Sequence, residues 1–130
     1  DFMADTGIQC SEDESELDAL RFAVTIATRL NRLASPVDGV TVNIGDEQRL
    51  GQDVRRALRF GFGGKLCIHP SQVGSIHAAF MPTEQELEWA RKVLAADAAA
   101  NGAAVQVDGR MVDLPVVLQA RRTVARAVPT

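Results

Sequence analysis

The sequence has few cysteines, no excess of basic charge and no long apolar run. Its two cysteines, Cys10 and Cys67, are far apart and form no CxxC pair, which favours a reduced, cytoplasmic protein. The formal net charge is -3, a balance that argues against nucleic acid and anionic membrane lipid as partners. No apolar run approaches the ~20 residues of a membrane-spanning helix, and the N-terminus lacks the pattern of a signal peptide. These absences exclude several classes of protein and leave the function open.

The chain does contain enough apolar sequence for one ordinary domain, since 46% of its 130 residues are apolar. In the first 80 residues, apolar side chains recur alternately at helical spacing and in short β-branched runs. Such a rhythm is typical of a parallel sheet with crossover helices. The expected elements are a helix at 14–33, a strand at 37–44 that is buried on both faces, a helix between Asp46 and Gly61, a strand at 65–69, and a helix from Ser71 to Phe80.

The pattern changes after residue 82. Thr83 and Glu86 have the spacing of a capping box, so a long helix should begin there and end near residue 101. Residues 103–113 form a hairpin pattern around the turn Asp108-Gly109. Asp113 then starts a last helix that runs to about residue 127.

The number of strands is too small for a complete fold. Two parallel strands, with a possible third ending at Asp1, cannot close a barrel, and a (β/α)8 barrel needs about 250 residues. The same count argues against an isolated flavodoxin-like domain with its own five-stranded sheet. We therefore expect the chain to be part of a larger polypeptide.

Several motifs, in the same order, resemble the end of the HpcH/HpaI aldolase–citrate lyase superfamily, in its CoA-ester lyase branch. The chain has GKLCIHP at 64–70, FMPT at 80–83 and GRMVDLP at 109–115. The opening DFMADTG is similar to the end of the sixth barrel strand of that family. The resemblance covers nearly the whole chain.

This resemblance implies a fold and an activity. Residues 1–80 would be the C-terminal portion of a (β/α)8 TIM barrel. Residues 81–130 would be a helix–hairpin–helix extension that reaches the active site of a neighbouring subunit, commonly in a homotrimer. The activity implied is a Mg²⁺-dependent retro-Claisen cleavage of a malyl-, citramalyl- or citryl-CoA-like thioester. A thioesterase using the same parts and a non-catalytic oligomerisation subunit remain alternatives.

The resemblance also assigns roles to individual residues. Asp1 falls where the family places one of two carboxylates that hold Mg²⁺, and hard cations prefer such oxygen ligands. Without the family, Asp1 would be simply a solvated terminal residue. The partner glutamate and a substrate-binding arginine of the family would precede Asp1, so this chain is expected to be inactive alone.

Asp113 matches the family residue that acts as a general acid or base at the α-carbon of the thioester, in the site of a neighbour. Its spacing alone favours a helix N-cap, and the two roles are compatible. Asp108 is a turn residue in either case.

Lys65 and His69 are weaker candidates at the rim of the site. The segment GFGGK at 61–65 fails both the Walker and the GxGxxG patterns. Lys65 is therefore expected either to neutralise a CoA phosphate or to be solvated. His69, at the end of the second strand, is expected at the site rim or in packing. The acidic run 12–18 is interpreted as a solvated helix N-terminus rather than a metal site.

Overall fold

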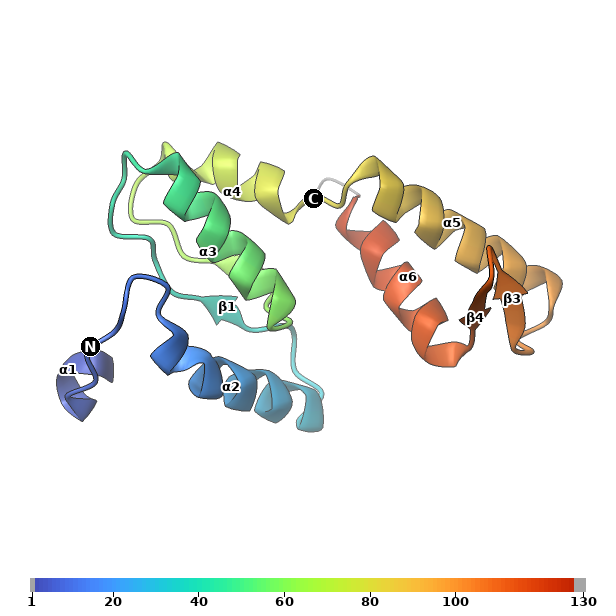
Figure 1. The fold of residues 1–130 in the computed structure, drawn as a ribbon, viewed down its shortest axis with the longest axis horizontal. Coiled ribbons are helices and arrows are strands. Elements are labelled where there is room, and N and C mark those ends of the chain that lie inside the picture. The colour runs from blue at the N-terminus through green and yellow to red at the C-terminus, as the bar shows by residue number, and fades with distance from the viewer. Residues whose placement is uncertain (1, 128–130) are drawn as a thin grey trace. The chain divides into compact units, whose positions relative to one another are not determined.

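The computed structural model describes residues 2–127, and the chain divides into two compact units, Asp1–Ala78 and Ala79–Thr130 (Figure 1). The elements of the first unit, with α4 continuing to Phe80, are α1 Phe2–Thr6, a 3-10 helix Ser15–Leu17, α2 Asp18–Leu30, β1 Val37–Asp38, α3 Glu47–Arg59, β2 Gly64–Lys65 and α4 Gln72–Phe80.

The strands of the first unit pair in parallel, as predicted, but each has only two residues. Val37 is opposite Gly64, and Asp38 is opposite Lys65. The strands predicted at 37–44 and 65–69 are therefore too long. Burial on both faces is also wrong, because Val37 is 55% exposed whereas Asp38 is 7% exposed. A sheet of two strands has no further strand to prolong its hydrogen-bond ladder or to cover its outer side chains, so its strands stay short and partly exposed.

The opening segment is helical where the resemblance implied a strand end. Residues 2–6 form α1, in which the Thr6 hydroxyl donates a hydrogen bond to the Phe2 carbonyl over 2.8 Å. No strand pairs with this segment in the described part of the chain, so local hydrogen bonds determine its conformation. Asp1 itself lies outside the described residues.

The helices agree better with the sequence pattern. The Asp46 side chain caps α3 by accepting from the Arg49 amide over 2.8 Å, as predicted. The helix predicted at 14–33 begins later, because Glu14 has a left-handed conformation with φ 54°. One turn of 3-10 helix follows before α2 starts at Asp18.

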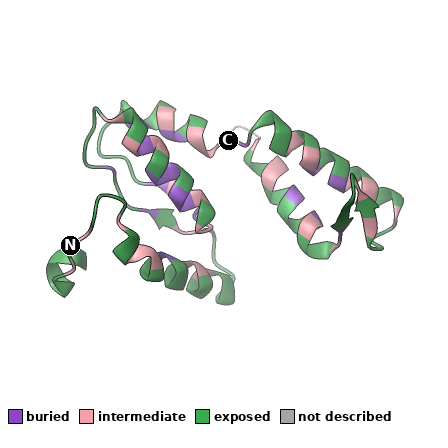
Figure 2. Cartoon of the chain, in the orientation of Figure 1, coloured by how far each residue is buried: buried purple, intermediate pink, exposed green. Residues whose placement is uncertain are grey.

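The apolar core of the first unit is small and lies mainly along α3 (Figure 2). Leu50, Val54 and Ala57 on one face of this helix are at most 3% exposed. Phe62 and Ile76 are the other buried apolar residues of this unit that the structure describes. Polar and charged residues make up much of the remaining interior: Arg21, Asp38, Thr41, Asp53, Arg56, Lys65 and Gln72.

The second unit consists of α5 Glu84–Ala99, the antiparallel hairpin β3 Val105–Val107 and β4 Arg110–Val112, and α6 Leu114–Arg126. The predicted capping box is present at the start of α5. Asp108 and Gly109 both have positive φ, 49° and 77°, as a type I′ hairpin turn requires. The core of this unit consists of Ala90, Val93, Val112, Val117 and Ala120.

Within residues 2–127, none of the helices combines the length and apolar character needed to cross a membrane.

Candidate functional site

Asp113 lies between the hairpin and α6, at the position predicted for an N-cap. One of its carboxylate oxygens, Oδ1, accepts a hydrogen bond from the Val116 amide over 3.4 Å, which confirms the capping role. The side chain is half-buried. Its Oδ2 accepts no hydrogen bond from any residue that the structure describes. Asp113 thus has one oxygen available to a ligand, and its catalytic role stays a prediction.

Two of the apolar side chains near Asp113 in the sequence are exposed. Met111 and Leu114 are 73% and 66% exposed, whereas Val112 between them is 1% exposed and belongs to the core. A half-buried carboxylate beside exposed apolar side chains would suit a subunit boundary, where such side chains are covered by a partner.

Lys65 is buried instead of solvated, so that alternative from the sequence is wrong. The residue is 9% exposed, and its ammonium donates a hydrogen bond to the Gly39 carbonyl over 2.6 Å. Burial lowers the pKa of Lys65 below its usual value, and the nearby carboxylates of Asp38 and Asp53 oppose this shift in part. Its contact with a CoA phosphate stays a prediction.

His69 is exposed and held in one orientation after β2. Its Nδ1 accepts from the Ser71 amide over 3.2 Å and lies 2.8 Å from the Ser71 hydroxyl. A ring nitrogen that accepts from an amide carries no proton, so the neutral imidazole has its proton on Nε2. His69 therefore presents a hydrogen-bond donor at the carboxyl end of the parallel strands. Its place at the rim of a CoA site stays a prediction.

The described residues do not form a metal site on their own. Asp1, the predicted ligand of Mg²⁺, lies outside them. Between residues 2 and 127, no three His, Cys, Asp or Glu side chains are grouped so that they could hold a metal ion.

The acidic run forms an ionic cluster with two helices, which the sequence pattern did not predict. Glu14 Oε2 accepts from Arg21 on α2 over 2.8 Å and from Arg56 on α3 over 2.6 Å. Arg56 also donates to the Asp13 carbonyl over 2.6 Å. Arg21 and Arg56 are 7% and 8% exposed, whereas Glu14 and Asp13 are in part open to solvent, so these contacts lie at the edge of the interior.

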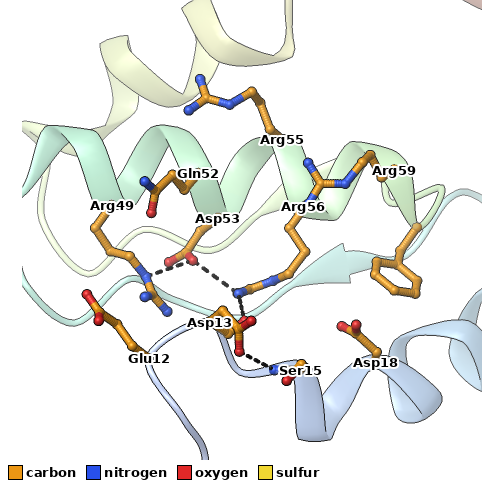
Figure 3. A pocket seen from close by; sticks show the side chains of 11 residues that line it. Glu12, Asp13, Ser15, Asp18, Arg49, Gln52, Asp53, Arg55, Arg56 and Arg59 are labelled. Atoms are coloured by element: carbon orange, nitrogen blue, oxygen red, sulfur yellow. Dashed lines mark hydrogen bonds and ion pairs between the residues drawn. The ribbon is translucent and has the colours of Figure 1, made fainter.

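The cluster continues along α3 through Asp53. Its Oδ1 lies 3.0 Å from Arg49 and 3.1 Å from Arg56, and its Oδ2 accepts from the Thr41 hydroxyl over 2.6 Å. In Figure 3 the side chains of Arg49, Asp53 and Arg56 point toward one another from the same helix. Only Oδ2 of this buried carboxylate accepts a hydrogen bond from the described residues, and the two arginine contacts compensate the Oδ1 oxygen, which is buried without one.

A cavity of about 770 Å³ lies beside the cluster, between the acidic run and α3 (Figure 3). Its lining balances four arginines against four carboxylates: Arg49, Arg55, Arg56 and Arg59 against Glu12, Asp13, Asp18 and Asp53. The charged side chains of the lining therefore carry no formal net charge.

The acidic run is therefore more than a solvated helix N-terminus. Hydrogen bonds from Ser11 and Ser15 lower the pKa of the Asp13 carboxyl, the Ser11 side chain first. The contacts of Glu14 with Arg56 join residues 42 positions apart, so no local spacing could reveal them. The sequence offered only one signal for this cluster, which was the presence of arginines within the two predicted helices.

Comparisons with known proteins agree on one family. A family model described as C–C bond lyase of the TIM-barrel fold matches residues 18–128. A citrate lyase subunit beta-like protein of Mycobacterium tuberculosis is 40% identical over 101 residues, which are 78% of this chain and 36% of that protein. The mitochondrial citramalyl-CoA lyase of Mus musculus is 30% identical over 130 residues, 98% of this chain and 38% of that protein.

A solved structure is similar over nearly the whole chain. It is the crystal structure of CitE from Mycobacterium tuberculosis in complex with magnesium, acetoacetate and coenzyme A. The TM-score is 0.82 at 32% identity, over 96% of this chain and 48% of that one. The chain thus spans about a third to a half of the length of these relatives. It belongs to the C–C bond lyase family of the TIM-barrel fold, among the citrate lyase subunit beta-like proteins.

Proposed function

We propose that this chain is the C-terminal part of a Mg²⁺-dependent lyase that cleaves a carbon–carbon bond in a 3-hydroxyacyl-CoA thioester. Residues 1–80 would complete the barrel, and residues 81–130 would form the extension. Malyl-, citramalyl- and citryl-CoA are the candidate substrates.

The similarity to the mycobacterial CitE is the observation that most supports this proposal. That protein was crystallised with magnesium, a keto acid and coenzyme A, and it is similar over 96% of this chain. Cleavage of a 3-hydroxyacyl-CoA of this class yields a keto acid and an acyl-CoA, so the two bound molecules match the two product classes.

In the cleavage, the 3-hydroxyl loses its proton, the C2–C3 bond breaks, and its electron pair moves to C2 as a thioester enolate. The enolate then needs a proton delivered at carbon by a positioned acid. Asp113 is our candidate for this acid, because the hydrogen bond of Oδ1 to the Val116 amide orients the carboxyl group and leaves Oδ2 available. We place its action in the site of a neighbouring subunit, in a homotrimer.

We propose that the cleavage depends on Mg²⁺ because CitE was crystallised with magnesium. Asp1 would contribute one of the metal ligands. A bound Mg²⁺ would polarise the oxygen that becomes the keto group. The described residues neither supply the remaining ligands nor fix their geometry.

The proposal is tested with the chain alone and with a polypeptide that includes the upstream half of the barrel. Each is incubated with the three thioesters, with and without Mg²⁺. Keto-acid release is followed with coupled dehydrogenases, and free thiol is followed with a disulfide reagent. A lyase releases keto acid without thiol, whereas a thioesterase releases thiol.

We expect the longer polypeptide to release keto acid in the presence of Mg²⁺ and the chain alone to be inactive. Absence of keto acid from all three substrates with the longer polypeptide would contradict the proposal. Light scattering of the same sample checks the trimer.

A further inference from the structure

A buried chain of polar contacts connects the loops that follow the two strands of the first unit. Gln72, at the start of α4, is 2% exposed and uses both ends of its amide. Its Nε2 donates to the Thr41 carbonyl over 2.9 Å, and its Oε1 accepts from the Ile68 amide over 3.1 Å. Thr41 follows β1 and Ile68 follows β2, so one side chain joins two loops at the carboxyl edge of the sheet.

The connection extends into the ionic cluster. The Thr41 hydroxyl donates to Asp53, which contacts Arg56, which in turn contacts Glu14. The loop before α2, the loop after β1 and the loop after β2 are therefore linked through a continuous set of polar groups, which are buried except for the partly exposed Glu14. In parallel α/β folds these loops form the face on which ligands bind.

Gln72 also determines the surroundings of His69. The residue before His69, Ile68, has its amide held by Gln72, and the His69 carbonyl accepts from the Gln72 amide over 3.1 Å. The ring is fixed from the other side by the Ser71 amide. The donor at Nε2 is thereby held in a defined place relative to the loop after β1.

We propose that Gln72 is a positioning residue that locks the loops after β1 and β2 together and so places His69 at the rim of the CoA-ester site. This inference rests on the proposed function. An apolar side chain at position 72 would fill the same buried space without the need to satisfy an amide, but it could not hold both loops.

The locking is tested on the chain itself by amide hydrogen exchange. We expect Gln72→Met, which keeps the length and loses both hydrogen bonds, to speed exchange at the Ile68 amide by at least about tenfold. The Leu66 amide, which directly follows β2 and donates to the Asp38 carbonyl over 3.0 Å, serves as the internal reference. Gln48→Met is the matched control, because Gln48 is exposed on α3.

The positioning role is tested kinetically in the longer, active polypeptide. A group at the rim contributes binding common to the ground state and the transition state, so Gln72→Met should raise KM for the thioester about tenfold and leave kcat within about twofold. Thr41→Val, which removes only the hydroxyl that bonds Asp53, should raise KM in the same direction by less. If Gln72→Met does not fold by circular dichroism, Gln72→Glu takes its place in the kinetic measurement, because it keeps an acceptor for the Ile68 amide and loses the donor to the Thr41 carbonyl; an unchanged KM would overturn the positioning.

Unchanged exchange at Ile68 would overturn the locking, and released Ile68 with unchanged KM would overturn the positioning. Both results leave the proposed function intact as long as the wild type cleaves the thioester. If the wild type does not cleave any substrate, the proposed function and the rim assignment both fail, and the exchange experiment alone decides whether the loops are locked.

Discussion

Glu14 combines a strained backbone with contacts to three arginines. A residue other than glycine at φ 54° costs about 1 kcal/mol or more, and persists only where its surroundings hold it. Here the Glu14 carboxylate contacts Arg21 and Arg56 at 2.8 and 2.6 Å, and Arg49 at 4.0 Å. These contacts from two helices explain why the helix predicted to begin at residue 14 starts one turn later.

We expect Glu14→Ala to destabilise the first unit by about 2 kcal/mol, because two buried guanidinium groups lose their shared carboxylate. The figure is below that of a fully buried pair, since the Glu14 side chain is 29% exposed and solvent screens it in part. Urea unfolding measures the change. Glu84→Gln is the control, as its pair with Arg91 is exposed and should contribute less than about 0.5 kcal/mol.

The two roles of Asp113 are separated by two substitutions. Asp113→Asn keeps an oxygen for the Val116 amide, so stability should change by less than about 0.5 kcal/mol, whereas Asp113→Ala should cost about 1 kcal/mol as a lost N-cap. Both should lower kcat of the longer polypeptide by about 10²-fold or more, because neither delivers a proton. An active Asp113→Asn enzyme would leave this residue only its structural role.

Lys65 and Lys92 should respond to pH in opposite directions. Burial lowers the folded-state pKa of Lys65 below the ordinary 10.5, so between these two values the unfolded chain binds more protons, and stability associated with Lys65 rises with pH. Hydrogen bonds to Glu88 and Asp108 raise the pKa of Lys92, so its contribution is present below 10.5 and is lost as pH rises through the folded pKa.

The measurement is the unfolding free energy of the wild type relative to Lys65→Met and to Lys92→Met, from neutral pH to above 10.5. Relative to Lys65→Met, the unfolding free energy of the wild type should rise as the pH approaches 10.5 from below. Relative to Lys92→Met, the unfolding free energy of the wild type should fall as the pH rises above 10.5. Parallel curves for Lys65→Met and the wild type would show that the lysine titrates normally.

At the level of elements, two glycines with open space around them provide a matched test. A Cβ at Gly109 or at Gly74 would meet nothing within 4 Å, but Gly109 has φ 77° in the hairpin turn, whereas Gly74 lies within α4 and has no such φ. Gly109→Ala should therefore destabilise the second unit by about 1 kcal/mol. Gly74→Ala should stabilise α4 by about 0.5–1 kcal/mol. Thermal unfolding, with amide exchange followed in each unit, measures both changes. If the two substitutions changed stability equally, the difference in φ between Gly109 and Gly74 would not be the cause.

The helices were predictable because their signals are local. Asp46, Thr83 and Asp113 each cap the helix that follows, as their positions indicated. The hairpin turn at Asp108-Gly109 was predictable for the same reason. The strand lengths and the ionic cluster were not, because they depend on partners distant in the sequence.

The site residues differ in the same way, because some depend on local sequence and others on distant partners. The cap formed by Asp113 follows from spacing, but the burial of Lys65 depends on Gly39 and on carboxylates of other elements. Gln72 gave no signal, since a glutamine at the start of a helix is ordinary in sequence and its two partners precede it by 31 and 4 positions.

At the level of the whole molecule, the two units differ in how far their apolar side chains are covered. The second unit surrounds a core of its own. The first exposes large apolar side chains on α2 and beyond both strands. Those at least half exposed are Phe22, Leu30, Leu33, Val37, Val42 and Leu66.

We expect a 1–78 fragment to bind a hydrophobic fluorescent dye strongly and to associate in solution. A 79–130 fragment should be helical and bind less dye, because its exposed large apolar side chains are fewer. Extension of the chain by the proposed upstream half of the barrel should reduce dye binding, because new strands would cover Val37 and Leu66. Fluorescence and light scattering measure both effects. A monodisperse 1–78 fragment without dye binding would contradict this view.

The interior of the first unit holds together α2, α3 and the sheet largely through ionised groups. Hydration of ions becomes less favourable on warming, so the penalty for keeping such groups away from water falls as temperature rises. Heating should therefore weaken this ionic layer less than it would weaken an apolar core of equal size, and cooling should not strengthen it. This polar layer should therefore be the part of the interior whose hold on the loops weakens least on heating.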